Sequence, residues 1–302
     1  MRRTFAFLLT VAVTPAALLA QQPAPAPTVE SSLVAGNVYM LVGQGGNLGL
    51  AVGADGAFLI DDQFAPLHES IVEAIEELTD DPDASERVFL LNTHFHPDHT
   101  DGNELLGERG AIILAHENVR TRLTVEQVIP FFNMRHPALA AHGLPILTFT
   151  RDVTLHLNGD EIDIQHVGGP AHTDGDSIVH FKKANVIHAG DIVFIGTYPF
   201  IDLDNGGSVA GVVAAVEQII ELANDTTKII PGHGPLIDKA GLVRFRTMLA
   251  TTSDRVKEMV AAGKSLDAVR DAKPTAEFDA DWSGFITTEA FVGILYRDAA
   301  GQ

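Results

Sequence analysis

The sequence predicts an α/β fold in which two mixed β-sheets pack face to face between outer helices, an αββα sandwich. Two observations predict it. A series of strand-like segments followed by an amphipathic helix occurs twice along the 302-residue chain. In both halves, histidine and aspartate side chains follow directly after strand-like segments, where a rigid strand end can hold them.

The first half begins with short apolar segments that read as strands, separated by glycine-rich and Asp-Gly turns. The segment 67–78 has apolar residues at helical spacing and is expected to cover one face of the sheet. A further buried strand is expected at 87–91. The strands expected before the helix span residues 38–42, 48–52 and 57–60.

Beyond a polar loop at 93–102, the order of elements predicts a parallel pair of strands. A short helix from Asn103, a strand at 111–115 and a helix at 117–127 complete a strand–helix–strand order. The segment 130–149 lacks periodicity and combines aromatic residues with prolines. It is either a lid that lines the mouth of a substrate site or a surface helix–loop packed for stability.

The second half repeats the order of strands followed by a helix. Alternating apolar residues predict two antiparallel strands joined by Asn158-Gly159-Asp160, then a second pair. An amphipathic helix is expected at 209–222 and a short strand at 228–230. The four earlier strands are expected at 153–157, 161–167, 177–181 and 186–188.

The chain after His233 is predicted to be a helical C-terminal tail that packs on the outer faces. Helices are expected at 242–262, 265–272 and 288–296, and Ser265 is a plausible N-cap for the second of them. Trp282 and Phe285 are expected in the core, with contact to a partner as the alternative.

The N-terminus has the pattern of a secretory signal peptide. Two arginines precede an apolar run that small residues close near Ala20. A membrane anchor is the alternative, but the run is short for a spanning helix. We therefore expect a signal peptide at 1–20, a Pro/Ala linker at 21–31 and a single domain at 32–302. The mature protein is expected to be periplasmic or secreted, without stable membrane association.

The charge and the cysteine content restrict the functions that are open to the chain. The formal net charge is −20, which repels phosphate backbones and argues against a nucleic-acid partner. There is no cysteine, so disulfides, thiolate ligands and cysteine nucleophiles are excluded. A small-molecule substrate is the partner expected.

The loop 93–102 concentrates the side chains that bind metals. His94 and His96 are two residues apart and share a face if the segment is extended. Asp98 and His99 follow Pro97, and the direction of both depends on where the backbone turns. Imidazole and carboxylate groups without a thiolate suit zinc and other divalent first-row metals. The simplest use of the loop is to supply two adjacent metals, and a solvated histidine-rich turn is the alternative.

This pattern resembles the signature of the metallo-β-lactamase-fold hydrolase superfamily. The residues that carry the resemblance are His94-x-His96-x-Asp98-His99, followed by Asp101-Gly102. Three later motifs stand in the order that the family implies, and the match runs from about Gly36 to His233. They are His172 within 169–176, Asp191 after Ala189-Gly190, and His233 within Pro231-Gly232-His233-Gly234.

The resemblance implies a dinuclear zinc hydrolase in which a metal-bound hydroxide attacks the carbonyl of an amide, lactam, lactone or ester. It implies two Zn²⁺ ions, with Mn²⁺ or iron as alternatives, and a catalytic role for Asp98 in orienting the hydroxide. Thr93, Asp62 and His188 could hold the ligands by hydrogen bonds. The implied ligands are His94, His96 and His172 for one ion, Asp98, His99 and His233 for the other, and Asp191 as the bridge.

The aspartate at 191 affects which substrate is expected. The best-known zinc β-lactamases of this fold carry Cys or Ser at that position, whereas the glyoxalase II and lactonase branches carry a bridging Asp. We therefore expect any β-lactamase activity to be weak, as for other exported members of the superfamily. Export and the lack of a basic pattern in the tail argue against a glutathione thioester. The alternatives are an iron-dependent oxidoreductase similar to a persulfide dioxygenase, and a non-catalytic binding module.

Overall fold

The computed structural model describes residues 26–79, 81 and 83–302. The signal peptide expected at 1–20 lies outside the described residues. The linker expected to reach residue 31 ends earlier, because the first strand begins at Glu30. That strand has mostly exposed residues, so its sequence lacks the apolar alternation of a half-buried strand.

The first sheet is mixed and contains seven strands within the described residues. Its first four strands pair antiparallel, and the remaining strands pair parallel, including the expected pair β5–β6. In spatial order the strands are β1 (Glu30–Ala35), β2 (Val38–Val42), β3 (Leu48–Gly53), β4 (Gly56–Ile60), β5 (Val88–Asn92), β6 (Ile112–His116) and β9 (Leu147–Phe149).

The second sheet is also mixed and has six strands within the described part of the chain. Only β13–β14 pairs parallel. Its order is β10 (Asp152–Leu157), β11 (Asp160–His166), β12 (Ser177–Phe181), β13 (Val186–His188), β14 (Lys228–Ile230) and β15 (Ile237–Asp238). A separate hairpin pairs β7 (Gln127–Ile129) with β8 (Met134–His136).

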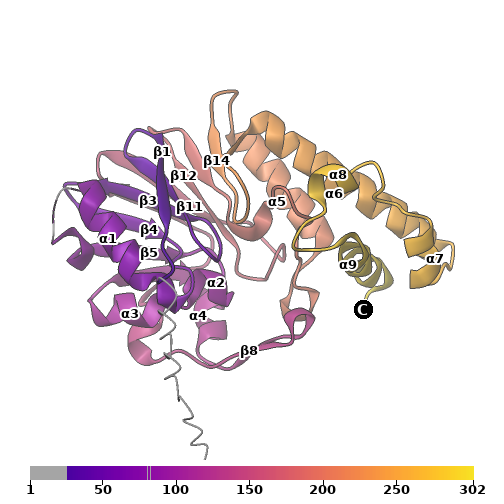
Figure 1. Ribbon diagram of the computed structural model, residues 1–302, viewed down its shortest axis with the longest axis horizontal. Helices are drawn as coiled ribbons and strands as arrows, with labels where there is room; N and C mark the ends of the chain where they lie inside the picture. The colour runs from indigo at the N-terminus through magenta and orange to yellow at the C-terminus, as the bar shows by residue number, and fades with distance from the viewer. Residues whose placement is uncertain (1–25, 80, 82) are drawn as a thin grey trace, which may run out of the picture.

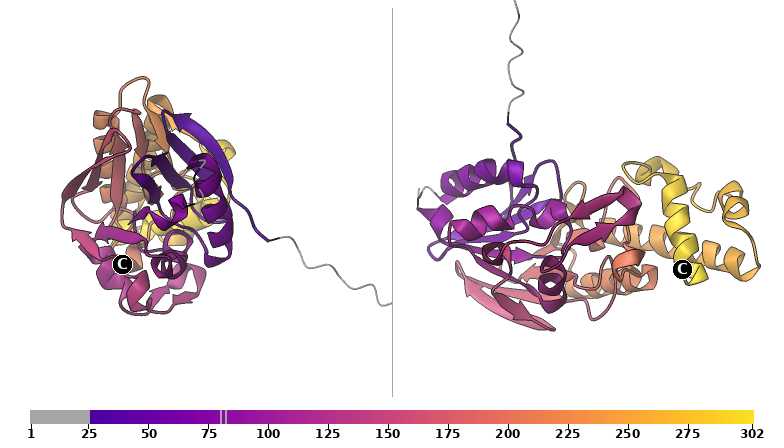
Figure 2. Two further views of the ribbon diagram at one scale, coloured as in Figure 1. Left: turned by 90° about the vertical axis from the view of Figure 1, so that its left-hand side faces the viewer. Right: turned by 90° about the horizontal axis from the view of Figure 1, so that it is seen from below.

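Helices cover the outer face of each sheet (Figure 1). Helix α1 lies over the first sheet, whereas α5 and α6 lie beside the second, and α7 and α9 form the far end of the molecule (Figure 2). The helices are α1 (His68–Thr79), α2 (Pro97–Thr100), α3 (Asn103–Glu108), α4 (Glu117–Leu123), α5 (Val209–Leu222), α6 (Lys239–Ala261), α7 (Leu266–Asp271), α8 (Asp279–Trp282) and α9 (Thr288–Ala300).

The apolar core consists of layers that match the sandwich. Phe58 and Ile60 of the first sheet meet Ile164 and Phe181 of the second in one buried cluster. A second cluster joins α1 to the outer face of the first sheet, and a third joins α5, α6 and α9 to the second sheet. At about 25 cal/mol per Å² of apolar surface removed from water, such interlocking faces supply the main force that docks the two halves.

The αββα sandwich predicted from the sequence is confirmed. The 209–222 helix has the predicted bounds, and Ser208 caps it by accepting from the Gly211 N–H. Helix α4 ends at Leu123 rather than 127, because Gln127 begins β7. Trp282 is buried as expected, but Phe285 is 77% exposed, so the core prediction for that residue was wrong.

None of the helices in the described ranges combines the length and the apolar character needed to cross a bilayer.

Candidate metal centre

The loop that follows β5 holds four of the candidate ligands. Its backbone is extended at His96, and Pro97 then starts the single turn of α2. Proline suits this first helical position because its fixed φ fits and its missing N–H would have no helical partner. The turn redirects Asp98 and His99 away from the face that His94 and His96 share. The direction of these two side chains, open from sequence, is therefore set by Pro97.

Four buried side chains form the first cluster of donor atoms, and all four atoms lie within 4.8 Å of one another. The Nδ1 of His96 lies 3.1 Å from His94 Nε2 and 2.9 Å from His172 Nε2. The Oδ2 of Asp191 lies 3.5 Å from His172 Nε2 and 3.8 Å from His94 Nε2. Residues almost a hundred positions apart thus converge on one point.

Asp98, His99 and His233 form the second cluster. Asp98 Oδ2 lies 3.3 Å from His233 Nε2 and 3.6 Å from His99 Nε2. Asp191 faces this cluster too, with Oδ1 3.1 Å from His99 Nε2 and Oδ2 3.4 Å from His233 Nε2. The structure therefore brings all seven predicted ligands together, with Asp191 between the two clusters.

Two buried atoms of this centre have no hydrogen-bond partner in the described part of the chain. They are His99 Nε2 and Asp191 Oδ1, both enclosed, which lie 3.1 Å apart without the alignment of a hydrogen bond. A buried polar atom without a partner costs about 1–3 kcal/mol, so such atoms are uncommon. Metal ions would satisfy both, and neutral imidazoles with carboxylates are the donors that divalent metals take. The residues present fit a divalent-metal centre.

Asp61 is the main support of the second cluster. Its buried carboxylate accepts from His99 Nδ1 at 2.8 Å, from the Thr93 N–H at 2.7 Å and from the Thr93 hydroxyl at 2.8 Å. The bond to Nδ1 leaves Nε2 of His99 free to face a metal. Asp61 has φ of +61°, a left-handed conformation that aspartate tolerates better than most residues.

The first cluster is supported from two sides. His96 Nε2 lies 3.0 Å from the buried carboxylate of Asp202, which also accepts from Asn205. His172 Nδ1 donates to the Phe200 carbonyl at 2.9 Å, and the Thr93 hydroxyl lies 3.1 Å from His94 Nδ1. Each of these contacts leaves the opposite ring nitrogen directed at the cluster.

The supports expected from sequence were correct in part. Thr93 contacts a ligand ring as expected. Asp62 instead accepts from the Gly102 N–H, and His188 binds the Asn47 carbonyl; within the described residues neither has a hydrogen bond to a ligand side chain. No sequence pattern indicated Asp202, because it lies in an irregular segment. Asp61 and Asp62 both follow the strand expected at 57–60, which is a signal for a support at this strand end, but the sequence does not show which of the two faces the ligands.

Burial and the neighbouring charges shift the pKa values of the candidate ligands in different directions. Burial lowers the pKa of His94 well below its usual value, and the neighbouring His99 lowers it further. Burial would also lower the pKa of His99, but the carboxylates that face it raise this pKa well above the usual range. Burial would raise the pKa of Asp98, whereas His99 and the hydrogen bond from His233 lower it to about 2. Asp98 is therefore an ionised acceptor at neutral pH.

A cavity of about 510 Å³ opens above the centre, with His96, Asp98, Asp191 and His233 among the residues that line it. Asp98 and His233 are the more exposed of these, with 24% and 28% of their side chains accessible. Of the segment 130–149, the described hairpin contributes Phe132 and Met134 to the wall.

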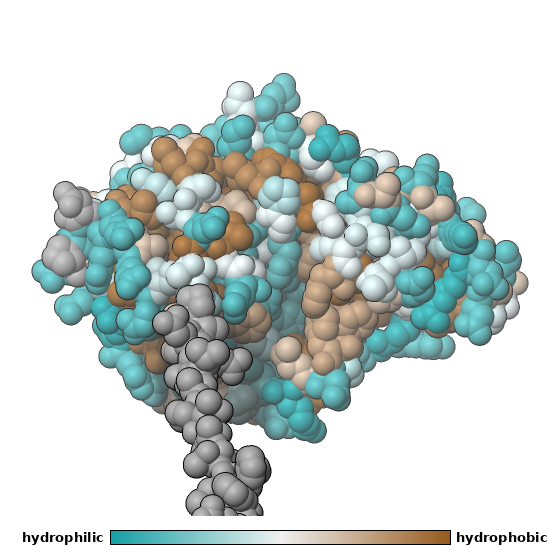
Figure 3. Space-filling model, viewed as in Figure 1, coloured by the Kyte–Doolittle hydropathy of each residue, from teal (hydrophilic) through white to brown (hydrophobic). Residues whose placement is uncertain are grey.

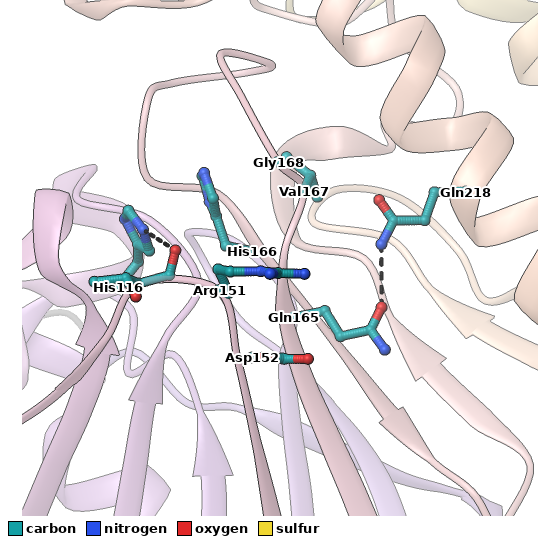
Figure 4. A pocket seen from close by; sticks show the side chains of 9 residues that line it. His116, Arg151, Asp152, Gln165, His166, Val167, Gly168 and Gln218 are labelled. Carbon is teal, nitrogen blue, oxygen red and sulfur yellow. Dashed lines mark hydrogen bonds between the residues drawn. The ribbon is translucent and has the colours of Figure 1, made fainter.

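A second cavity of about 610 Å³ lies elsewhere, and none of the seven ligands lines it. The imidazoles of His116 and His166 stack there with centroids 3.9 Å apart. His116 bonds to the Thr150 carbonyl, and Gln165 bonds to Gln218 (Figure 4).

Comparison with known proteins places the chain in a family. The profile of the metallo-beta-lactamase superfamily matches residues 67–233, more than half of the chain and the stretch that holds all seven candidate ligands. The chain belongs to the metallo-beta-lactamase superfamily.

Solved structures share the fold at low sequence identity. A metallo-beta-lactamase from Pontibacter korlensis superimposes with a TM-score of 0.59 at 17% identity, over 74% of this chain and 99% of that one. The DIM-1 metallo-beta-lactamase gives a TM-score of 0.57 at 18% identity, over 74% and 98%. A hydroxyacylglutathione hydrolase of Erythrobacter litoralis is 30% identical over 108 residues, which span 35% of this chain and 34% of that relative's length.

Proposed function

We propose that the protein is a dinuclear metal-dependent hydrolase that cleaves an amide, lactam, lactone or ester bond. One observation carries the proposal: Asp191 faces both donor clusters, and its Oδ1 lies buried 3.1 Å from the buried Nε2 of His99, although neither atom has a hydrogen-bond partner among the described residues. A structural site is usually closed by its ligands, whereas this centre opens into a cavity of substrate size. Superfamily membership and the hydroxyacylglutathione hydrolase relative support hydrolysis.

The positions of the seven candidate ligands indicate which ion each of them would hold. His94, His96 and His172 would hold one ion, Asp98, His99 and His233 the other, and Asp191 would face both. Bound divalent ions would polarise a substrate oxygen and lower the pKa of a water towards ~7.

Asp98 is the ligand best placed for a second role. Its ionised carboxylate reaches the cavity and can accept a hydrogen bond from the attacking water, which orients that water towards the substrate. The aromatic side chains above the centre restrict the access of other waters to it. We propose zinc as the ion, with Mn²⁺ or iron as alternatives, because the donors are nitrogen and oxygen only.

The test combines metal content with turnover. The protein, purified without chelators, is expected to carry two equivalents of a divalent metal and to hydrolyse at least one member of a panel of lactones, thioesters and a chromogenic β-lactam. Asp98→Asn should lower kcat by about 10²-fold or more. Protein without metal that is inert to the whole panel would overturn the proposal, as would oxygen consumption with a persulfide by an iron-loaded form.

We also propose that the protein works outside the cytoplasm, after removal of residues 1–20, on a small-molecule substrate. The support is the charged, apolar and small-residue pattern of that segment. Mass spectrometry of protein recovered from a periplasmic extract is expected to show an N-terminus near Gln21. Recovery of the uncleaved chain from the cytoplasm would contradict export.

A further inference from the structure

The cavity above the centre has a polar floor and an apolar wall. Metal-ligand side chains form the floor, and aromatic and aliphatic side chains form most of the wall. The rings of the wall contact one another: Phe132 lies 4.8 Å from Phe200 and 5.6 Å from Phe285, between ring centroids. Phe200 in turn lies 5.8 Å from the imidazole of His96, so the apolar surface reaches the first cluster.

Three segments that are distant in sequence supply most of the apolar side chains of this wall. The β7–β8 hairpin supplies Ile129, Phe132 and Met134, the segment after β13 supplies Phe194 and Phe200, and the loop between α8 and α9 supplies Phe285. The tail loop is fixed to the wall, because the Ile286 N–H donates to Thr197 Oγ1 at 3.0 Å.

Phe285 occupies the rim of this cavity in an unusual way. It stacks on Phe132 with an interplanar angle of 22°, yet 77% of its surface stays exposed. An exposed ring on a fixed loop beside a cavity marks a surface that can bury an apolar ligand. On the face drawn in Figure 3, by contrast, hydrophilic residues cover most of the C-terminal helices.

No lysine or arginine is among the described residues that line the cavity. The polar wall residues are the uncharged Gln44 and Thr197. Arg135 lies in the hairpin next to Met134, but it pairs with Glu126. Arg122 binds Asp174 and the Asn205 carbonyl, so its guanidinium is occupied. A substrate carboxylate would therefore meet no cationic side chain along the wall.

We propose, building on the proposed hydrolase function, that the site takes uncharged substrates with an apolar or aromatic group beside the scissile carbonyl, and discriminates against substrates with a carboxylate there. The apolar group would lie against Phe132, Phe200 and Phe285 while the carbonyl faces the floor. Substrates that depend on an anionic group for binding, such as bicyclic β-lactam carboxylates or glutathione thioesters, would be poor.

The physical reason is a difference in desolvation. Each methylene that leaves water against the wall contributes favourably to binding. A carboxylate in the same place loses its hydration without a hydrogen-bonding or charged partner, and the acidic chain adds repulsion. The preference thus arises both from the apolar side chains of the wall and from the lack of a lysine or arginine among the described residues that line it.

The test uses two γ-lactones that differ only at the end of the side chain, one with a heptyl group and one with a 6-carboxyhexyl group. The metal-loaded protein is expected to favour the heptyl lactone in kcat/KM by about tenfold or more. Phe132→Ala should lower kcat/KM for the heptyl lactone about tenfold and narrow the gap between the two lactones.

Two charge variants sharpen the test. Gln44→Lys adds a cation at the cavity mouth and should raise kcat/KM for the carboxylated lactone by about threefold at low salt. Arg135→Gln is the matched control, because this side chain already pairs with Glu126 and does not line the cavity. It should leave the ratio between the lactones unchanged. Equal or greater activity on the carboxylated lactone would overturn the inference while leaving the hydrolase function intact.

A measurement of binding affinity tests the apolar preference independently of hydrolysis. Calorimetry with the corresponding non-hydrolysable cyclic ethers is expected to show the heptyl compound binding at least about tenfold more tightly than its carboxylated counterpart. If no lactone is turned over, the hydrolase proposal fails, but this binding ratio still tests the apolar preference. Equal affinity for the two ethers would reject the preference whether or not turnover is observed.

Discussion

The replacement Asp61→Asn removes the negative charge beneath the second cluster while keeping the size of the side chain. The carboxylate accepts three hydrogen bonds, two from Thr93 and one from His99 Nδ1. An asparagine offers one acceptor oxygen and one donor NH₂ group. At least one of the three donors must then face another donor in a site that is fully buried.

The size of the effect can be worked from these contacts. Loss of a support that orients a ligand imidazole typically weakens metal binding 10- to 100-fold, or about 1.4–2.8 kcal/mol. A buried donor without a partner costs a further ~1–3 kcal/mol of folding stability. In the two-ion centre that we propose, Asp61→Asn should weaken binding of the ion at the second cluster 10- to 100-fold, while the ion at the first cluster is largely retained.

Asp62→Asn is the matched control at the next position. Burial raises the pKa of the Asp62 carboxyl well above its usual value, and neighbouring Asp61 raises it further, so both disfavour a charge at this position. An asparagine keeps an acceptor oxygen for the Gly102 N–H, and within the described residues the Asp62 side chain has no hydrogen bond to a ligand side chain, so metal binding should change little. Competition against a chromophoric chelator gives both metal affinities. If Asp62→Asn weakens metal binding as much as Asp61→Asn does, the assignment of the supporting role is wrong.

Three further predictions follow from the same geometry. Asp202→Asn removes the carboxylate that faces His96 Nε2 and should weaken binding of an ion at the first cluster about tenfold. Competition against a chelator measures this affinity, and an unchanged value would contradict the supporting role of Asp202. Gly46→Ala places a Cβ 2.1 Å from the imidazole of His99 and should abolish binding of an ion at the second cluster. Gly169→Ala is the control, because its Cβ would meet no atom within 4 Å, and it should leave the metal content unchanged. The pKa of Asp62 is higher in the folded state than in the unfolded state, where it is about 4. Between these two pKa values the wild type therefore loses stability as pH rises, by up to about 1.4 kcal/mol per pH unit. Urea unfolding of metal-free Asp62→Asn should then show a stability gain over wild type that grows with pH, and a constant difference would refute it.

Regular periodicity made much of the fold predictable. The 209–222 helix combines inward-facing valines and isoleucines with a serine N-cap, so pattern and capping agree. The antiparallel pair β10–β11 shows strict alternation around an Asn-Gly turn, and both residues of that turn have positive φ. Where local signals agree in this way, the tertiary structure adds little that the sequence does not already indicate.

The elements that sequence missed are those whose identity depends on a partner. Strand β1 is largely exposed and polar, and only its pairing with β2 makes it a strand. The β7–β8 hairpin has three-residue strands that are too short to show a period. Phe285 is apolar like a core residue, yet it lies exposed at the cavity rim, because its neighbour Ile286 is the residue that is buried and bonded to Thr197.

The same division holds at the metal centre, with a physical reason. Ligands recur in short motifs because one strand-end loop delivers several of them, so the loop 93–102 was readable. A residue that supports a ligand by a hydrogen bond needs only one acceptor oxygen at the right position, and any segment of the chain can supply it. Asp61 and Asp202 come from segments 141 positions apart and share no pattern. The acids at the end of the 57–60 strand only indicated a possible support at 61–62, and geometry is needed to select Asp61 and to find Asp202.

Hydrogen bonds that position the ligands also connect the two halves of the sandwich. Asn47, from the first half, donates through its side chain to the Pro231 and Gly234 carbonyls at 2.9 and 2.8 Å, on either side of His233. The backbone N–H of Asn47 also donates to the Gly232 carbonyl at 2.7 Å. The position of His233 therefore depends on a loop of the opposite sheet, and the second cluster exists only when the halves are docked. By linkage, any ion bound there stabilises the docked sandwich over its separated halves, so metal affinity and sheet packing are coupled through Asn47.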